Sequence, residues 1–553
     1  MRTASPGRDR ETVTAIEPTN SAGPPPSNTA SRYTAPVLVF WGLAAALLPV
    51  MVLASFHFGV TWDEKSRHHY GELIWDFYTG VRGMEAFPET GGHLYGGLFD
   101  LLAVAAEHVF PGNRYEIRHV IGALFGWLGI VYAGRLAGRF FGAWSAVITL
   151  ALLTLSPRFF GDAMNNPKDL PFAAMSVVSL YYISLMSPRW PYLSLGTAVK
   201  MAIPLALALS IRAGALLYAG YAGMLGAAFF IAERQWDWRR LLNLSLRLLG
   251  LLAAVLVMGT VAWPWAQQNP LIRPIMGLVG FSSYDYGGMV LFRGVEYLAF
   301  KLPWTYVPTW IAISTPPVVL LGVLLSLAPQ PAGARWPRAA LWFTVLLPIA
   351  MIVLRGSTIY DGIRHLLFTY PPFVVIAASG WAAWLSPAVS QRRRMAAGVL
   401  LAVGLADVMI FNVRAFPNQI VYFNQLAGGP KGAFLRYDMD YWGNCLLEAV
   451  DWSADLARRA GQPVVVSGNA WQIIQLDSER FKELAFTPPW RGNEHVTIRL
   501  NRGPIEGMRE LVGRTDALYQ VKTPDGVVLC AVFPGPAFDQ LRPSLARAER
   551  AER

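Results

Sequence analysis

Two adjacent carboxylates, Asp63 and Glu64, directly follow the first long apolar segment of the chain. That segment runs from residue 36 to about residue 60 and is long enough for a helix to cross a bilayer. A carboxylate at the mouth of a membrane helix can accept a proton from a hydroxyl group while a lipid-linked substrate keeps its tail in the membrane. The pair could also simply mark the solvated end of a helix, so its role depends on the residues that the fold brings to it.

Basic residues in the predicted outer segments are the second feature that could take part in chemistry. Segments predicted to share the outer side with Asp63 hold Lys168, Arg212, Arg273, Arg293, Lys301, Arg355 and Arg364. Translocated loops of membrane proteins usually carry few basic residues, so we expect this set to have a further role, and phosphate binding is the most direct one. Lys168, Arg212, Arg364 and the adjacent His365 are the predicted phosphate ligands. Each could instead cap a helix or extend to the membrane interface.

Two further residues, Asp162 and His69, are candidates for binding an acceptor or for a second acidic site, although Asp162 could simply balance Arg158. No Cys and His cluster has the spacing of metal ligands. Asp63, Glu64 and Asp162 would make a sparse set of oxygen ligands for a divalent cation. No metal site and no cofactor are therefore predicted, and a divalent metal is kept as an alternative.

The composition indicates an integral membrane protein. Of the 553 residues, 54% are hydrophobic and only 15% are charged, whereas soluble domains carry about 25% charged residues. The formal net charge is +11. In a soluble protein this charge would suggest nucleic acid, but in a chain with many membrane segments it faces anionic lipid or phosphate. Membrane lipids are thus expected partners, and nucleic acid is not.

The hydropathy pattern predicts a mainly α polytopic protein with about eleven transmembrane helices. They fall at 36–60, 117–137, 140–156, 169–187, 192–210, 213–232, 242–264, 306–327, 337–354, 365–386 and 394–413. Short loops on one side are rich in arginine, as at Arg135, Arg139 and 392–394, which makes that side cytoplasmic. The expected location is the inner membrane, with a cytoplasmic N-terminus and a periplasmic C-terminal domain. Asp63 and Glu64 then lie outside.

Three regions are predicted. Residues 1–34 are polar and rich in Pro, Ser and Thr, which is typical of a disordered tail. Residues 35–413 form the transmembrane catalytic domain, and 414–553 form a small α/β domain outside the membrane. The first external loop contains two apolar stripes with helical spacing, at 70–77 and 94–109. We expect two helices that lie in the membrane interface or pack on the external domain.

The C-terminal region carries strand and turn signals. Residues 464–466 are typical of a buried strand, 451–460 of a helix, and 518–533 of a hairpin closed by a turn with Asp525 and Gly526. Cys445 and Cys530, the only two cysteines, both fall in this region. A disulfide between them is compatible with an oxidising compartment, but their spacing does not establish it.

One external carboxylate with several cations suits the transfer of a sugar from a lipid phosphate. Phosphate is already a good leaving group, so such an enzyme needs cations for the departing charge and one base for the incoming hydroxyl. Direct displacement inverts the anomeric centre, whereas a retaining mechanism needs two carboxyls about 5 Å apart across the bond. Asp63 is the predicted base. Glu64 is predicted to position a group or bind the acceptor, and the two roles could be exchanged.

The sequence resembles the C-type (GT-C) superfamily of membrane glycosyltransferases, in particular family 39 with the protein O-mannosyltransferases and the lipid A aminoarabinose transferase. The matching stretches are Trp62-Asp63-Glu64, His69-Tyr70-Gly71, Asn166-Pro167-Lys168-Asp169, Leu302-Pro303-Trp304, Arg364-His365 and Asp440-Tyr441-Trp442-Gly443. The resemblance implies a polyprenyl- or dolichyl-phosphate sugar as donor, reaction at the outer face, and the acidic residue of the first loop as catalytic base.

The predicted function is therefore that of an inverting glycosyltransferase that moves a sugar from a polyprenyl-phosphate donor to a hydroxyl of a glycan, lipid or protein. The lipid-linked sugar is a co-substrate. One alternative is a glycan ligase or polymerase that acts on lipid-linked saccharides. The other is a transporter, which should carry charges in the middle of its membrane helices and show two similar halves. Lys200 and Asp407 are the only candidates for such charges, and no repeated half is apparent.

Overall fold

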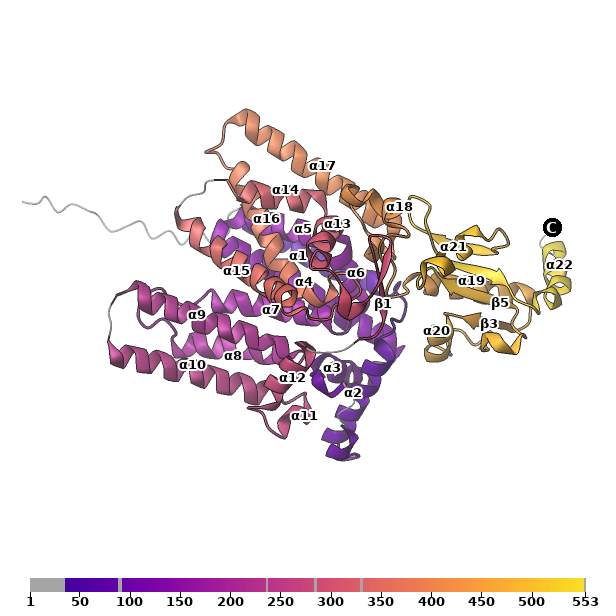
Figure 1. The fold of residues 1–553 in the computed structure, drawn as a ribbon, viewed down its shortest axis with the longest axis horizontal. Helices are drawn as coiled ribbons and strands as arrows, with labels where there is room; N and C mark the ends of the chain where they lie inside the picture. Colours follow the sequence, from indigo (N-terminus) through magenta and orange to yellow (C-terminus); the bar gives the residue numbers. More distant parts are fainter. Residues whose placement is uncertain (1–34, 88–91, 235–236, 283–285, 329–331, 552–553) are drawn as a thin grey trace, which may run out of the picture.

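The computed structural model describes residues 35–551 apart from 88–91, 235–236, 283–285 and 329–331. The predicted tail at 1–34 lies outside the described residues. Helices gather at one end of the molecule, and a part that contains a sheet, formed by the C-terminal residues and drawn in yellow, lies at the other end (Figure 1). This arrangement agrees with a mainly α chain that carries a small α/β part near its C-terminus.

The helices of the first part are α1 (Ala35–Ser55), α2 (Glu64–Tyr78), α3 (Leu98–Glu107), α4 (Arg114–Phe141), α5 (Ala143–Leu155), α6 (Pro157–Asn165), α7 (Asp169–Ile183), α8 (Leu195–Leu209), α9 (Leu216–Ala232) and α10 (Trp238–Gly259). There follow α11 (Pro264–Gln267), α12 (Arg273–Ser282), α13 (Tyr306–Ser314), α14 (Pro317–Ser326), α15 (Ala332–Arg355), α16 (Tyr370–Trp384) and α17 (Gln391–Ala415). The last part holds α18 (Gly429–Ala433), α19 (Cys445–Ala460), α20 (Trp471–Leu476), α21 (Ile505–Gly513) and α22 (Arg542–Ala551).

The count of eleven membrane spans is not confirmed. Within the described residues, seven helices are long and apolar enough to cross a membrane, and two bent pairs, α5–α6 and α13–α14, raise this number to at most nine. Each predicted segment does contain a helix, but α7 and α8 have only 15 residues each. The bent pairs turn by 68° and 109° just before Pro157 and Pro317. Proline has no N–H to donate and disfavours the helical conformation of the residue before it, so it divides these two segments.

Small residues allow the central helices to pack closely. A Cβ atom on Gly126 of α4 would lie 2.6 Å from the Cβ of Ala163 in α6. A Cβ atom on Gly380 of α16 would lie 2.1 Å from the carbonyl oxygen of Gly322 in α14. Neither position can hold a larger side chain, as is common where membrane helices approach one another. These contacts bring α4 close to α6 and α14 close to α16.

The segment between α1 and α4 does contain two helices, α2 and α3, where the apolar stripes predict them. A buried set of ion pairs ties both to α4: the Arg67 Nε donates to Asp100 Oδ2 at 3.0 Å, and the Arg118 Nη2 donates to Asp100 Oδ1 at 2.9 Å. Gly71 of α2 lies against the backbone of Asp100. This segment is therefore held rigidly over one end of the bundle. Its depth relative to the membrane interface stays a prediction.

The C-terminal sheet has the strand order β4-β3-β5-β7-β6. Its strands are β3 (Val464–Gly468), β4 (Leu484–Phe486), β5 (Val496–Leu500), β6 (Tyr519–Lys522) and β7 (Val528–Pro534). Strand β3 pairs in parallel with β4 and β5, whereas β7 pairs antiparallel with β5 and β6. The predicted strand at 464–466 and the predicted hairpin at 518–533 are thus confirmed. A disulfide joins Cys445 of α19 to Cys530 of β7, with their Cα atoms 5.9 Å apart, and so settles the pairing that the spacing left open.

A second, smaller hairpin was not predicted from the sequence. It consists of β1 (Met289–Phe292) and β2 (Val295–Leu298), which pair antiparallel. The amide of Gly294 at its tip donates to the carbonyl of Arg436 at 3.0 Å, so the hairpin packs on the segment that leads into the C-terminal part. The strands are only four residues long, and their apolar pattern is too short to be distinguished from a buried helical turn.

Candidate functional site

Asp63 lies at the centre of a charged cluster between the helix ends. Lys168 Nζ lies 2.8 Å from Asp63 Oδ2, and Arg364 Nη1 donates to the same oxygen at 3.1 Å. The side chain of Asp63 is 26% exposed, whereas those of Lys168 and Arg364 are 13% and 5% exposed. Three residues separated by more than a hundred positions in the sequence therefore meet with one carboxylate oxygen between two cations.

Local structure explains how each residue reaches this point. Asp63 occupies the N-cap position of α2, directly after the turn that follows α1. Lys168 precedes α7, where the Asn166 Oδ1 accepts hydrogen bonds from the amides of Lys168 and Asp169 at 3.2 and 2.9 Å and so caps the helix. Arg364 opens the 3-10 helix η6 (Arg364–Thr369), which continues into α16.

The turn before Arg364 is strained. Asp361 has φ +58° and Gly362 has φ +70°, both in the left-handed region. This conformation is unfavourable for a non-glycine residue such as Asp361 and is found mostly where the surrounding structure enforces it, often at functional sites. Here it directs Asp361 back toward Arg364, whose Nη2 lies 3.2 Å from Asp361 Oδ2. The turn thus fixes the orientation of the guanidinium that holds Asp63.

Further charged and aromatic side chains surround Asp63, Lys168 and Arg364. Arg212 forms an ion pair with Asp169, and Arg364 Nη1 lies 3.9 Å from Asp169 Oδ2. The ring of Tyr95 lies 4.8 Å from Lys168 Nζ and 5.6 Å from the guanidinium of Arg212. On the other side, the rings of Tyr360 and Trp442 lie 4.7 and 4.9 Å from the guanidinium of Arg364. We call Asp63, Lys168, Asp169, Arg212, Asp361 and Arg364 the charged cluster.

Three buried ring and guanidinium nitrogens close to Asp63 in the sequence or in the cluster make no hydrogen bond to a described residue. They are the Nε1 of Trp62, the Nε of Arg364 and the Nδ1 of His365. Buried polar atoms in native proteins are almost always paired, so such atoms indicate a ligand or water at this place. The Nε of an arginine is always a donor, and an anionic oxygen satisfies it best. The cluster is therefore suited to receive a phosphate beside Asp63.

The electrostatics keep Asp63 ionised. Burial by itself raises the pKa of Asp63, but attraction to Lys168 and then to Arg364 outweighs burial and holds the pKa well below its usual value. A carboxylate between two cations is a weak base in this resting state.

Glu64 faces the opposite direction, into the protein. It is 1% exposed. Its Oε2 accepts hydrogen bonds from the amide and hydroxyl of Thr61 at 2.7 and 3.2 Å, and its Oε1 lies 3.0 Å from His119 Nε2. These contacts tie the loop before α2 to α4. Glu64 thus holds the backbone on which Asp63 is mounted, which leaves Asp63 alone at the open side.

We expect Glu64→Ala to lower the free energy of unfolding by about 3 kcal/mol, because the buried amide of Thr61 and the ring of His119 would both lose their partner. The midpoint of thermal unfolding of the detergent-solubilised protein, followed by tryptophan fluorescence, measures this change. Glu72→Ala on the same helix is the matched control, since that side chain is 44% exposed. An equal loss in both variants would contradict the buried role of Glu64.

Of the other predicted site residues, Asp162 and His365 lie beside the charged cluster, whereas His69 does not. Asp162 is buried, and its Oδ1 accepts from Asn166 Nδ2 and from Trp442 Nε1, both at 3.0 Å. It therefore supports the walls of the cluster. His69 lies on the exposed side of α2, where its Nδ1 lies 3.4 Å from Glu72 Oε2, and it is not brought to the cluster. His365 packs against the ring of Tyr360.

Residues of the C-terminal part form one side of the charged cluster, and the sequence did not predict this. Arg502 Nη2 donates to Asp361 Oδ1 at 2.6 Å, and its Nη1 donates to the carbonyl of Tyr441 at 2.6 Å. The side-chain amide of Gln472 donates to the carbonyl of Thr61. The turn at Asp361, which orients Arg364, is thus fixed by an ion pair with Arg502 of the C-terminal part. No local pattern marks Arg502, whereas Asp361 and Gly362 form a turn signal directly before Arg364.

Asp438, on this side of the charged cluster, predicts a pH effect on stability. Burial raises the pKa of Asp438 to about 7, and Arg502 opposes this only partly. An unfolded aspartate has a pKa of about 3.9. Between about pH 4 and pH 7 the folded protein therefore holds a proton that the unfolded chain has lost, and stability falls as the pH rises. We expect Asp438→Asn to flatten this decrease in thermal unfolding midpoints, whereas exposed Asp455→Asn leaves it unchanged.

No group of three or more His, Cys, Asp or Glu side chains is placed to hold a metal ion in the part of the chain that the structure describes. The carboxylates of the charged cluster are engaged by arginine or lysine instead.

Comparisons with known proteins concern the fold. No family model matches the chain, and no curated protein matches its sequence. Among solved structures it is similar to ArnT from Cupriavidus metallidurans in the apo state, with 14% identity and a TM-score of 0.46 over 89% of this chain and 97% of that one. It is also similar to the arabinofuranosyltransferase AftD from Mycobacteria, with 16% identity and a TM-score of 0.40.

The match to AftD covers 77% of this chain but only 29% of that protein. At these identities and TM-scores the likeness concerns the course of the chain and assigns no donor, acceptor or mechanism.

Proposed function

We propose that this protein is a GT-C glycosyltransferase that moves a sugar from a polyprenyl-phosphate donor to a hydroxyl acceptor at the outer face of the membrane, with inversion at the anomeric carbon. The single observation that supports this most strongly is the meeting of Asp63 with Lys168 and Arg364. Each of the two cations lies within hydrogen-bond distance of the carboxylate, at the end of a bundle of apolar helices.

The cations supply the larger part of the catalysis. In the donor, the phosphate binds to Lys168 and Arg364, whose Nε has no protein partner among the described residues. As the bond from the anomeric carbon to the phosphate oxygen breaks, its electron pair leaves with the phosphate. Fixed cations in a site with little water stabilise this charge strongly and need no rearrangement. Arg212 supports them through Asp169.

Asp63 accepts the proton of the acceptor hydroxyl. The acceptor oxygen attacks the anomeric carbon from the face opposite the phosphate, and its proton passes to the carboxylate. Because donor phosphate competes for Lys168 and Arg364, its binding weakens their hold on Asp63 and raises the basicity of Asp63 at the moment of reaction. A base that is weak without donor and strong with donor avoids unproductive chemistry in the resting enzyme.

The exposure of the carboxylates supports inversion. A retaining mechanism needs a second carboxyl about 5 Å away across the bond as nucleophile. Asp63 is 26% exposed, whereas Asp169 and Asp361 are 3% and 9% exposed and Glu64 is buried against Thr61 and His119. A transporter is supported less well, since Asp407 accepts a hydrogen bond from Gln425 at 3.1 Å and Lys200 is exposed at the helix surface.

Proteoliposomes that contain the purified protein test the proposal. They are given polyprenyl-phosphate carrying a labelled hexose or pentose, together with an extract of envelope glycans, lipids and proteins as acceptors. We expect release of polyprenyl phosphate that depends on the acceptor, and a product whose anomeric configuration, read by NMR, is opposite to that of the donor. Retained configuration would exclude the single displacement. Folded protein that turns over none of the donors would exclude the proposed function.

A further inference from the structure

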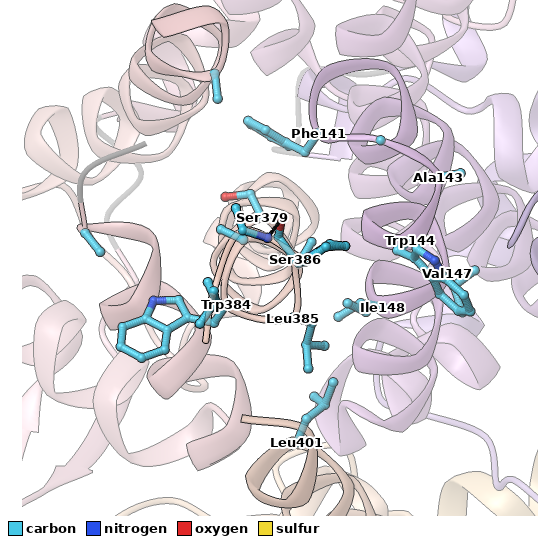
Figure 2. A pocket seen from close by; sticks show the side chains of 18 of the residues that line it. Phe141, Ala143, Trp144, Val147, Ile148, Ser379, Trp384, Leu385, Ser386 and Leu401 are labelled. Atoms are coloured by element: carbon cyan, nitrogen blue, oxygen red, sulfur yellow. Dashed lines mark hydrogen bonds between the residues drawn. The ribbon is translucent and has the colours of Figure 1, made fainter. Parts of the chain in front are cut away.

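A cavity of about 1220 Å³ lies between the ends of α4, α5, α15, α16 and α17. Figure 2 shows its apolar walls, with Phe141, Trp144, Ile148, Leu385 and Leu401 around the opening between the helices. The volume exceeds the roughly 300–1,000 Å³ that is usual for small-molecule sites. Its shape and lining suit a large ligand with an apolar body.

The charged side chains that line the cavity are basic. Among the described lining residues, Arg338 and Arg393 are charged and none is Asp or Glu. Arg338 is only 8% exposed, and its Nε donates to Ser379 Oγ at 3.3 Å, the bond that is drawn beside Ser379 in Figure 2. No carboxylate of the described chain lies within ion-pair distance of it. A buried guanidinium without a counter-charge is costly, so an anion is expected beside it.

This cavity is far from the charged cluster. Arg364 stands at the beginning of the helical segment 364–384, and the residues that line the cavity stand at its other end. A helical segment of that length spans about 30 Å. The cavity therefore opens at the end of the bundle where Arg139 and 392–394 gather. Clusters of basic residues at this end of membrane helices face the leaflet that is rich in anionic lipid.

We propose that this cavity binds one anionic phospholipid. The phosphate of the headgroup pairs with Arg338 inside and Arg393 at the rim, and an acyl chain lies along the apolar wall past Trp144 and Leu401. A zwitterionic headgroup carries its own cation and would bring it next to two arginines, so it binds less well. The proposal is independent of the reaction at Asp63, because it rests on residues at the opposite end of the helices.

Native mass spectrometry of the purified full-length protein tests this inference. The protein is titrated in detergent micelles with phosphatidylglycerol, with phosphatidylcholine of the same chain length, and with inorganic phosphate. We expect one phosphatidylglycerol per protein to survive gentle activation, with at least tenfold weaker retention of phosphatidylcholine. Competition by inorganic phosphate at concentrations similar to those of the lipid would show a site for free phosphate and overturn the proposal.

Variants separate this site from general surface charge. Arg338→Gln is expected to lower phosphatidylglycerol retention about tenfold, as loss of a charge-assisted bond implies. Arg392→Gln is the matched control. It removes the same charge from an exposed position next to Arg393 that does not line the cavity, and this variant should retain the lipid.

Ala382→Leu narrows the cavity without changing its charge and should also lower lipid retention. This variant tests the proposal if Arg338→Gln does not fold. Equal retention in wild type and Ala382→Leu, or equal losses in Arg338→Gln and Arg392→Gln, would overturn it.

Discussion

Asp63→Asn is expected to lower kcat for sugar transfer by about 10³-fold, within the range that a general base contributes, while donor affinity stays the same or increases. The amide cannot accept the proton of the acceptor hydroxyl. It also no longer neutralises Lys168 and Arg364, which lie 2.8 and 3.1 Å from the carboxylate oxygen. Both cations then become fully available to the donor phosphate. Rates from labelled donor, together with donor binding by fluorescence or calorimetry, separate the two effects.

Two variants serve as controls for this result. Asp76→Asn on the same helix removes a partly exposed carboxylate that pairs with Arg82 outside the charged cluster and should leave both quantities unchanged. Glu64→Gln keeps the shape of the buried side chain and should reduce kcat much less than Asp63→Asn. A variant Asp63→Asn that keeps most of its turnover would remove Asp63 from the mechanism. A full loss in Glu64→Gln with normal thermal stability would exchange the roles of the two residues.

The ionised state of Asp63 also has a consequence for the pH profile. A carboxyl whose folded pKa lies below its unfolded value stabilises the protein above that unfolded value, and the contribution is lost as the pH falls through the folded pKa. Because the pKa of Asp63 is held well below its usual value, this contribution should persist at pH values of about 4 and above.

Arg364→Gln is expected to have the largest effect on stability and donor affinity together. Its guanidinium pairs with Asp63 and Asp361 and lies 3.9 Å from Asp169, at 5% exposure. Removing it leaves these carboxylates next to one another in a largely buried place, and breaking one buried ion pair already costs about 3–5 kcal/mol. We expect a lower midpoint of thermal unfolding and a donor affinity that is reduced by at least tenfold.

Arg355→Gln is the matched control for Arg364→Gln. Arg355 is an exposed arginine on the last turn of α15, nearby in the sequence and outside the charged cluster. It should change neither quantity. Donor affinity that is equal in wild type and Arg364→Gln, measured at a temperature where both are folded, would mean that the phosphate binds elsewhere.

The link through Arg502 gives the C-terminal part a defined role in this scheme. Arg502 forms an ion pair with Asp361, Asp361 with Arg364, and Arg364 with Asp63. These successive ion pairs connect the loop after β5 to the N-terminus of α2. Each charge lies beside one of opposite sign, and the C-terminal part supplies the last of them, Arg502.

Apolar segments, helical stripes and strand patterns were predictable because each depends on residues near one another in the sequence. The helices α2 and α3, the strand β3 and the hairpin of β6 and β7 follow from spacing alone. The number of membrane spans did not follow, since α7 and α8 have only 15 residues each and the segments divided before Pro157 and Pro317 bend by 68° and 109°. The sequence also singled out Asp63, Lys168 and Arg364 by their residue types and their predicted common side.

Only the tertiary structure decided which of these residues meet. Asp63 and Glu64 are neighbours in the sequence, yet packing directs one to the open side between two cations and buries the other against His119. Tyr95 and Arg502 carry no local signal for their place in the site, and the turn signal at Asp361 and Gly362 does not show that Asp361 pairs with Arg502. Such contacts join positions hundreds of residues apart, and they depend on how α2, α7, α16 and the C-terminal sheet pack together. A local pattern specifies an element, but the pairing of charges across elements depends on the whole fold.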